Sequence, residues 1–236
     1  MSIPRLHALV LAGASLLLSA CASQPPTPDW QANAFAALKE FSAAYLSGNS
    51  RVADAELARA KSEIARTGRA DLMARAELTR CAVRVASLEF DACASYQPLA
   101  PDVTPQEQAY AAFLTGQWTS LNPELLPAQY RAWVSTVVTR GNAATPAPVS
   151  QLITLEDPLA RLVAAGVLLQ TQRLSPADIT QATQTASDQG WRRPLLAWLG
   201  VQRQQADAAG DSASSARLQQ RINLVLQRPL PTSAVQ

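Results

Sequence analysis

Histidine is nearly absent from this chain of 236 residues, and the single one, His7, lies among the first 20 residues. These residues have the three parts of a cleaved export signal: positive charge at Arg5, an apolar run over 8–18, and the small residues Ser19 and Ala20. Cleavage would remove His7 and leave the mature chain without imidazole, the commonest general base near neutral pH and a common metal ligand. Its loss excludes Ser-His-Asp and Cys-His catalysis.

Other catalytic patterns are missing as well. The chain contains no G-x-S-x-G, G-x-G-x-x-G, G-x-x-x-x-G-K-[ST] or S-x-x-K motif and no EF-hand loop. Structural zinc prefers four Cys or His ligands, and after the export signal only Cys21, Cys81 and Cys93 are available. The close carboxylate pairs, Glu89/Asp91 and Glu156/Asp157, are explained by a solvated turn and a helix N-cap. We therefore predict a non-catalytic protein with no cofactor and no metal site.

The export signal ends in Leu18-Ser19-Ala20-Cys21. This segment resembles the lipobox of bacterial lipoprotein signals, and the resemblance implies removal of residues 1–20 and acylation of Cys21, which would anchor the chain to a membrane. Ala22 follows the cysteine, where lipoproteins retained in the inner membrane usually carry Asp, so the resemblance implies the periplasmic face of a Gram-negative outer membrane. An ordinary secretory signal that leaves Cys21 as a free thiol is the alternative.

Helical periodicity dominates the chain after a proline-rich tether over 21–28. Helix starts at Thr104-Pro105, Asp157-Pro158 and Ser175-Pro176 agree with glycine stops such as Gly48. The spacing places several aromatic residues on inward faces: Phe35, Phe41, Tyr45, Tyr110, Phe113, Tyr130 and Trp133. We predict an all-α domain of about nine helices over 29–228 and a disordered tail over 229–236.

Two segments, 43–64 and 204–225, share a pattern of helix, Gly-Asn or Gly-Asp turn, and Ala/Arg-rich helix. They resemble tetratricopeptide and related helical repeats, although the full 34-residue consensus is missing. The resemblance implies an irregular array of antiparallel helical hairpins. A generic helical bundle is the alternative.

Cys81 and Cys93 are the two thiols that remain after acylation of Cys21, and an even pair in an oxidising compartment favours a disulfide. Twelve residues of unbroken helix would place them about 18 Å apart, whereas a disulfide needs Cα atoms within about 7 Å. The bridge therefore requires the helix to end near Leu88 and the chain to fold back. Two free buried thiols are the alternative.

Charge is unevenly distributed, although the formal net charge is only +2, which argues against nucleic acid as a partner. No Lys or Arg occurs between Val85 and Tyr130, while six arginines occur between Arg192 and Arg228. These two regions either neutralise each other or present an acidic surface to a basic partner. The residues predicted for such a surface are Glu89, Asp91, Asp102, Glu107 and Trp118.

Together these features predict a lipid-anchored, periplasm-facing outer-membrane adaptor or assembly factor that binds another envelope protein through its helical hairpins. A periplasmic protein that binds a small ligand or lipid in an apolar cavity is the alternative. An enzyme that acts on cell-wall glycan through carboxylates such as Glu89 is a third hypothesis.

Overall fold

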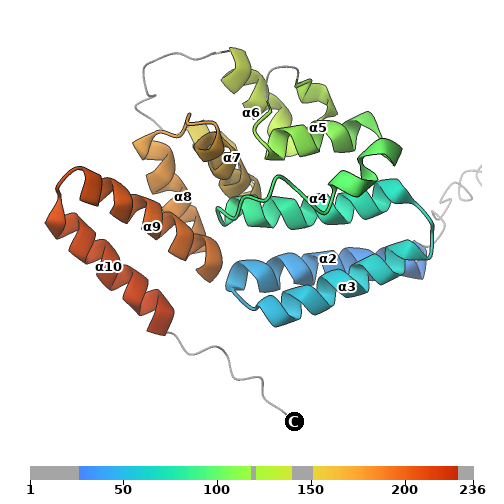
Figure 1. The fold of residues 1–236 in the computed structure, drawn as a ribbon, viewed down its shortest axis with the longest axis horizontal. Helices are drawn as coiled ribbons and strands as arrows, with labels where there is room; N and C mark the ends of the chain where they lie inside the picture. Colours follow the sequence, from blue (N-terminus) through green and yellow to red (C-terminus); the bar gives the residue numbers. More distant parts are fainter. Residues whose placement is uncertain (1–26, 118–120, 140–150, 228–236) are drawn as a thin grey trace, which may run out of the picture.

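The computed structural model of this protein describes residues 27–117, 121–139 and 151–227 (Figure 1). In these ranges it has nine α-helices, three short 3₁₀ helices and no strand, which confirms the predicted all-α fold. The α-helices are α2 (Asp29–Ser47), α3 (Ser50–Ala65), α4 (Ala70–Ala86), α5 (Pro105–Leu114), α6 (Ala128–Thr139), α7 (Pro158–Gln170), α8 (Pro176–Asp188), α9 (Arg192–Ala208) and α10 (Ser212–Gln227). The 3₁₀ helices are η1 (Gln97–Asp102), η2 (Pro123–Leu125) and η3 (Gln151–Thr154).

Some of the sequence predictions concern segments outside the described residues. These are the lipidation of Cys21, most of the tether, Trp118 and the tail over 229–236. Among the residues that the structure does describe, no helix is long and apolar enough to cross a bilayer.

The predicted helix starts are confirmed, and each has a local chemical cause. Asp157 caps α7, with its Oδ1 accepting a hydrogen bond from the Ala160 backbone N–H at 2.6 Å. Ser175 and Asp178 form a reciprocal capping box at the start of α8. Gly48 ends α2 with a φ of 88°, a backbone conformation that glycine adopts without steric cost.

The prediction that Phe35 faces inward is wrong, because its side chain is 73% exposed. The buried positions of α2 include Ala34, Ala37 and Phe41, a stripe that runs beside Phe35 on the helix surface. The facing helix α3 buries Ala53, which is as small as Ala34 and Ala37 of α2. Small residues let the two helix backbones approach closely, so the interface uses the alanines and leaves the bulky ring in solvent.

Helix α4 lies at the centre of the molecule (Figure 1). The α2–α3 hairpin packs along one side of α4, and α5 and α7 pack against it elsewhere. At the closest approach of α4 and α7, a Cβ on Gly166 would lie 2.3 Å from the Val85 carbonyl oxygen. At the end of α4, the buried Trp198 indole of α9 donates a hydrogen bond to the Ala86 carbonyl at 3.2 Å. The hairpin that precedes α4, the helix α5 that follows it, and the more distant α7 and α9 therefore all meet on α4.

Candidate binding pocket and its supporting network

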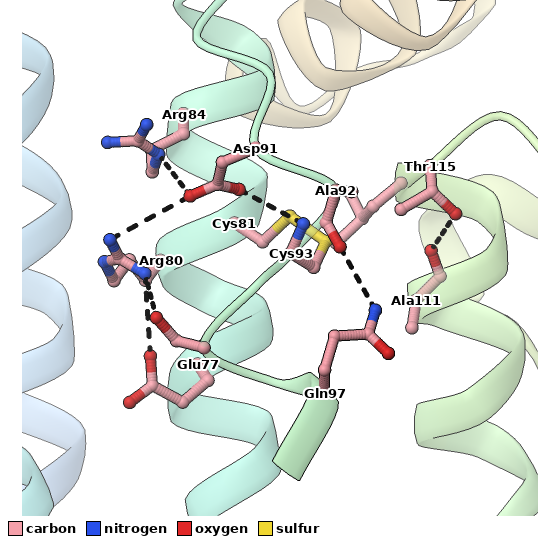
Figure 2. Close-up of a disulfide and its surroundings, with 12 residues drawn as sticks. Glu77, Arg80, Cys81, Arg84, Asp91, Ala92, Cys93, Gln97, Ala111 and Thr115 are labelled. Atoms are coloured by element: carbon pink, nitrogen blue, oxygen red, sulfur yellow. Dashed lines mark hydrogen bonds and ion pairs between the residues drawn. A yellow bond between two sulfur atoms is a disulfide. The ribbon is translucent and has the colours of Figure 1, made fainter. Parts of the chain in front are cut away.

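Cys81 of α4 and Cys93 of the following loop form a disulfide, with Cα atoms 5.2 Å apart (Figure 2). Helix α4 ends at Ala86, and Leu88, with a φ of 61°, turns the chain back. Both the pairing and the predicted helix end near Leu88 are confirmed. Ala92 and Cys93 also have φ values of 51° and 52°. Left-handed backbone costs a non-glycine residue about 1–2 kcal/mol, so this loop depends on contacts that hold it.

Asp91 supplies one set of these contacts. Its Oδ1 accepts a hydrogen bond from the Cys93 backbone N–H at 3.1 Å. Its Oδ2 lies 3.0 Å from Nε of Arg84 and 3.9 Å from Nη2 of Arg80. Figure 2 shows both arginines reaching from α4 toward this carboxylate. Asp91 therefore fixes the loop against the helix beside the disulfide.

Glu89 extends this network to two other helices. The Tyr45 hydroxyl of α2 donates to Glu89 Oε2 at 2.7 Å, and Arg193 Nη1 of α9 lies 3.1 Å from Oε1. Arg193 also donates from Nε to the Tyr45 carbonyl at 2.8 Å and stacks over its ring at 4.1 Å. Burial, and then the hydrogen bond to Glu89, raise the pKa of Tyr45. This cluster joins the first hairpin, α4 and α9.

Most of the buried or half-buried carboxylates in the acidic stretch between Val85 and Tyr130 are paired within the chain. Glu89, Asp91 and Glu107 each pair with an arginine of the same chain, whereas Asp102 and Glu124 are exposed. The ion pair between Glu89 and Arg193 is a direct instance of the predicted neutralisation between the acidic and basic regions. A surface for a partner therefore has to be sought where charges are not already paired.

A hollow of about 320 Å³ lies between α4, α5, η2 and α6, and we call it the α4–α6 pocket. Its lining combines apolar side chains with two arginines and one glutamate. The lining residues are Arg75, Leu78, Thr79, Gln106, Glu107, Tyr110, Leu125, Leu126, Pro127 and Arg131. Apolar walls with a few polar groups are typical of binding pockets.

Glu107 is buried in the wall of this pocket and is only 4% exposed. Its Oε1 lies 2.7 Å from Arg75 Nε, and its Oε2 accepts from the Thr104 backbone N–H at 3.1 Å and from the Thr104 hydroxyl. Burial alone would raise the pKa of Glu107, but the hydrogen bonds from Thr104 and Arg75 together lower it below its ordinary value. Glu107 is therefore a satisfied carboxylate that positions Arg75.

Arg131, which α6 contributes to the pocket lining, is held in a similar way. Its Nε donates a hydrogen bond to the Leu126 carbonyl at 2.8 Å. For Arg75 and Arg131 alike, the contacts found among the described residues are made through Nε. The terminal Nη groups of both side chains are thus available to a bound anion.

An aromatic cluster packs against Tyr110 of the pocket lining. Tyr110 stacks on Phe113 and Tyr130, with ring centroids 6.2 and 5.9 Å away, and Phe113 meets Trp133 edge to face at 6.4 Å. The predicted inward positions of these four residues are confirmed. Burial raises the pKa of Tyr110 to about 12, so its hydroxyl is neutral at physiological pH.

The pocket lining contains four titratable side chains. Its titratable groups are Arg75, Arg131, the paired Glu107 and the neutral Tyr110. Across the part of the chain that the structure describes, no group of three His, Cys, Asp or Glu residues could hold a metal ion.

The sequence indicates Glu107 as a residue of an acidic surface and Tyr110 as an inward-facing residue, but it does not predict the pocket. Arg75 and Arg131 were overlooked because they lie outside the cation-free stretch, one on each side of it. The one local signal is that Arg131 is the first cation after a segment rich in proline and leucine; Arg75 has no such signal, because Arg80 and Arg84 lie between it and that segment.

Comparison with known proteins finds no family model, no curated protein and no solved structure that matches this chain. The case for its function therefore depends on its own residues.

Proposed function

We propose that this protein is a lipid-anchored outer-membrane adaptor that binds another envelope protein through the α4–α6 pocket. The observation that carries the proposal is a pocket of about 320 Å³ whose apolar lining adjoins two arginines with available Nη groups. The proposed anchor rests on the lipobox ending at Cys21. A single acyl chain binds membranes only marginally, so several chains on Cys21 would be needed to hold the adaptor in place.

The paired charges elsewhere favour the pocket over the acidic stretch as the contact site. Forming a complex with Glu89 or Asp91 would require a partner to compete with Arg193 and Arg84. A partner that binds in the pocket does not have to displace such an ion pair, because the contacts of Arg75 and Arg131 are made through Nε and not through the Nη groups.

A pair of variants tests the proposal. Leu125→Asp places a charge in the pocket lining, whereas Ile153→Asp makes the same kind of change on η3, at a side chain that is already 60% exposed. Tagged full-length chains are crosslinked in intact cells, purified from envelopes and analysed by quantitative mass spectrometry. We expect a protein partner that is recovered with the wild type and with Ile153→Asp and is depleted at least tenfold with Leu125→Asp.

Circular dichroism of both variants is the control that tests whether they are folded. Equal recovery of all partners with Leu125→Asp would contradict the proposed role of the pocket.

Binding of a small ligand or lipid is the second candidate function, and it is favoured by the size of the pocket, which is near the lower end of the range of about 300–1,000 Å³ for ligand sites. Native mass spectrometry of the purified full-length chain tests it. A bound small molecule that is lost in Leu125→Asp and retained in Ile153→Asp would favour this function over the adaptor.

A further inference from the structure

The α4–α6 pocket brings an apolar lining and two guanidinium groups into one hollow, and this combination defines the chemistry of its occupant. We propose that the pocket binds the free carboxyl terminus of a partner protein whose last residue has a large apolar side chain. This inference rests on the proposed adaptor function and names the feature that the partner must present.

The two arginines of the pocket provide the contacts for the carboxylate. Arg75 on α4 and Arg131 on α6 are both held through Nε, by Glu107 and by the Leu126 carbonyl respectively. A guanidinium that is fixed at Nε still offers its Nη groups, and a carboxylate accepts two parallel hydrogen bonds from such a fork. Since Glu107 balances only one of the two cations, the lining keeps an excess positive charge that favours an anion.

The leucines of the pocket provide the contacts for the apolar side chain. Leu78, Leu125 and Leu126 line the same hollow as the arginines, with the ring of Tyr110 beside them. The aromatic cluster behind Tyr110 fixes this wall. A rigid apolar wall loses little conformational entropy when it binds a side chain.

A carboxyl terminus supplies both groups from a single residue. A C-terminal residue carries its carboxylate and its side chain on the same Cα, so both fit into one hollow of about 320 Å³. An internal Asp or Glu supplies the charge without an apolar body, and a long fatty acid supplies both groups but needs more room for its chain.

The test uses fluorescence anisotropy with the full-length chain in lipid nanodiscs. The probe is a pool of amino-terminally labelled short peptides that end in Leu, Phe, Ile or Val, prepared once with a free carboxyl group and once with a carboxamide. Because a hydrogen bond to a charged group contributes about 1.5–3 kcal/mol, we expect the carboxamide pool to bind about tenfold or more weakly. Unlabelled dodecanoate, added as a competitor, tests the fatty-acid source.

Variants of the chain connect this effect to the pocket. Arg131→Gln removes one fork and is expected to weaken binding of the free-acid pool about tenfold while leaving the carboxamide pool unchanged. Arg66→Gln is the matched control, because Arg66 is an exposed arginine of the turn that follows α3. It is expected to bind like the wild type.

Equal binding of the two pools, no binding of the free-acid pool at millimolar concentration, or no effect of Arg131→Gln would each overturn the inference. Displacement of the free-acid pool by dodecanoate at lower concentration than by the unlabelled pool would overturn it in favour of a fatty acid. The adaptor proposal survives these outcomes if a partner is still lost with Leu125→Asp. It fails separately if that loss is not seen.

Discussion

At the scale of single residues, Glu107 connects the stability of the fold to the geometry of the pocket. Its carboxylate closes the capping box at the start of α5 and at the same time orients Arg75 of α4. Glu107 offers little surface to a partner, because its side chain is only 4% exposed. Its role is to position the arginine.

The pH dependence of stability tests this role. Since the folded-state pKa of Glu107 is lowered, its ionised form stabilises the fold at pH values above the ordinary carboxyl pKa, and this contribution is lost as the pH falls through the folded-state pKa. We expect Glu107→Gln to lower the free energy of unfolding by about 1–3 kcal/mol at pH 7. The difference from the wild type should shrink below about pH 4.

Urea unfolding at pH 7 and at low pH measures both values. Glu124→Gln is the control, because Glu124 is an exposed carboxylate, and it should change stability by less than about 0.5 kcal/mol. A gap between Glu107→Gln and the wild type that stays constant with pH would contradict the account.

At the scale of secondary-structure elements, the loop that follows α4 is held by covalent and ionic contacts together. The disulfide fixes Cys93, and Asp91 and Glu89 fix the loop to arginines of α4 and α9. Three residues of this loop have left-handed backbone without being glycine, namely Leu88, Ala92 and Cys93. Loss of the covalent contact should therefore free a segment with little intrinsic preference for its folded conformation.

Replacing both Cys81 and Cys93 by Ser is expected to lower the free energy of unfolding by about 2–3 kcal/mol, the order of magnitude for a disulfide that closes a short loop. Urea unfolding of the variant and of the wild type, each with and without reductant, measures the change. Reductant should destabilise the wild type by a similar amount and leave the variant unaffected. Equal stability of the oxidised wild type and the variant would show that the bridge adds nothing to the fold.

The helix starts and the disulfide are the parts of the structure that could be predicted from the sequence. Helix boundaries depend on neighbouring residues, so Asp157-Pro158 and Ser175-Pro176 were sufficient to locate the starts of α7 and α8. The disulfide was predictable because only two thiols remained and because chain geometry set the condition for pairing.

Features that depend on distant segments were not predictable in this way. The side of α2 that is buried depends on the alanines of α3, which is why Phe35 was assigned to the wrong face. The pocket requires α4, η2 and α6 to meet, and sequence periodicity describes one helix at a time. Neutralisation between the acidic and basic regions is one of two alternatives that the sequence leaves open, and only the fold, which places Arg193 of α9 beside Glu89, decides between them for this residue.

At the scale of the whole molecule, α4 organises the array. The first hairpin and α9 are joined to the end of α4 through Tyr45, Glu89 and Arg193, and α7 packs against it at Gly166. The pocket lies on another side of α4, where α5 contributes its wall. In our account, the network around Glu89 gives the molecule its rigidity, and the α4–α6 pocket provides the binding function.

Site-specific photocrosslinking in living cells tests this central claim most directly. A photoreactive amino acid is introduced at Leu125 in the pocket or at Ile153 on η3 as the control, and the adducts formed on irradiation are compared. Our account predicts a discrete protein adduct from position 125 that is absent from position 153 and whose yield falls when Arg131→Gln is added. Identical adduct patterns from the two positions, or no protein adduct from position 125, would contradict it.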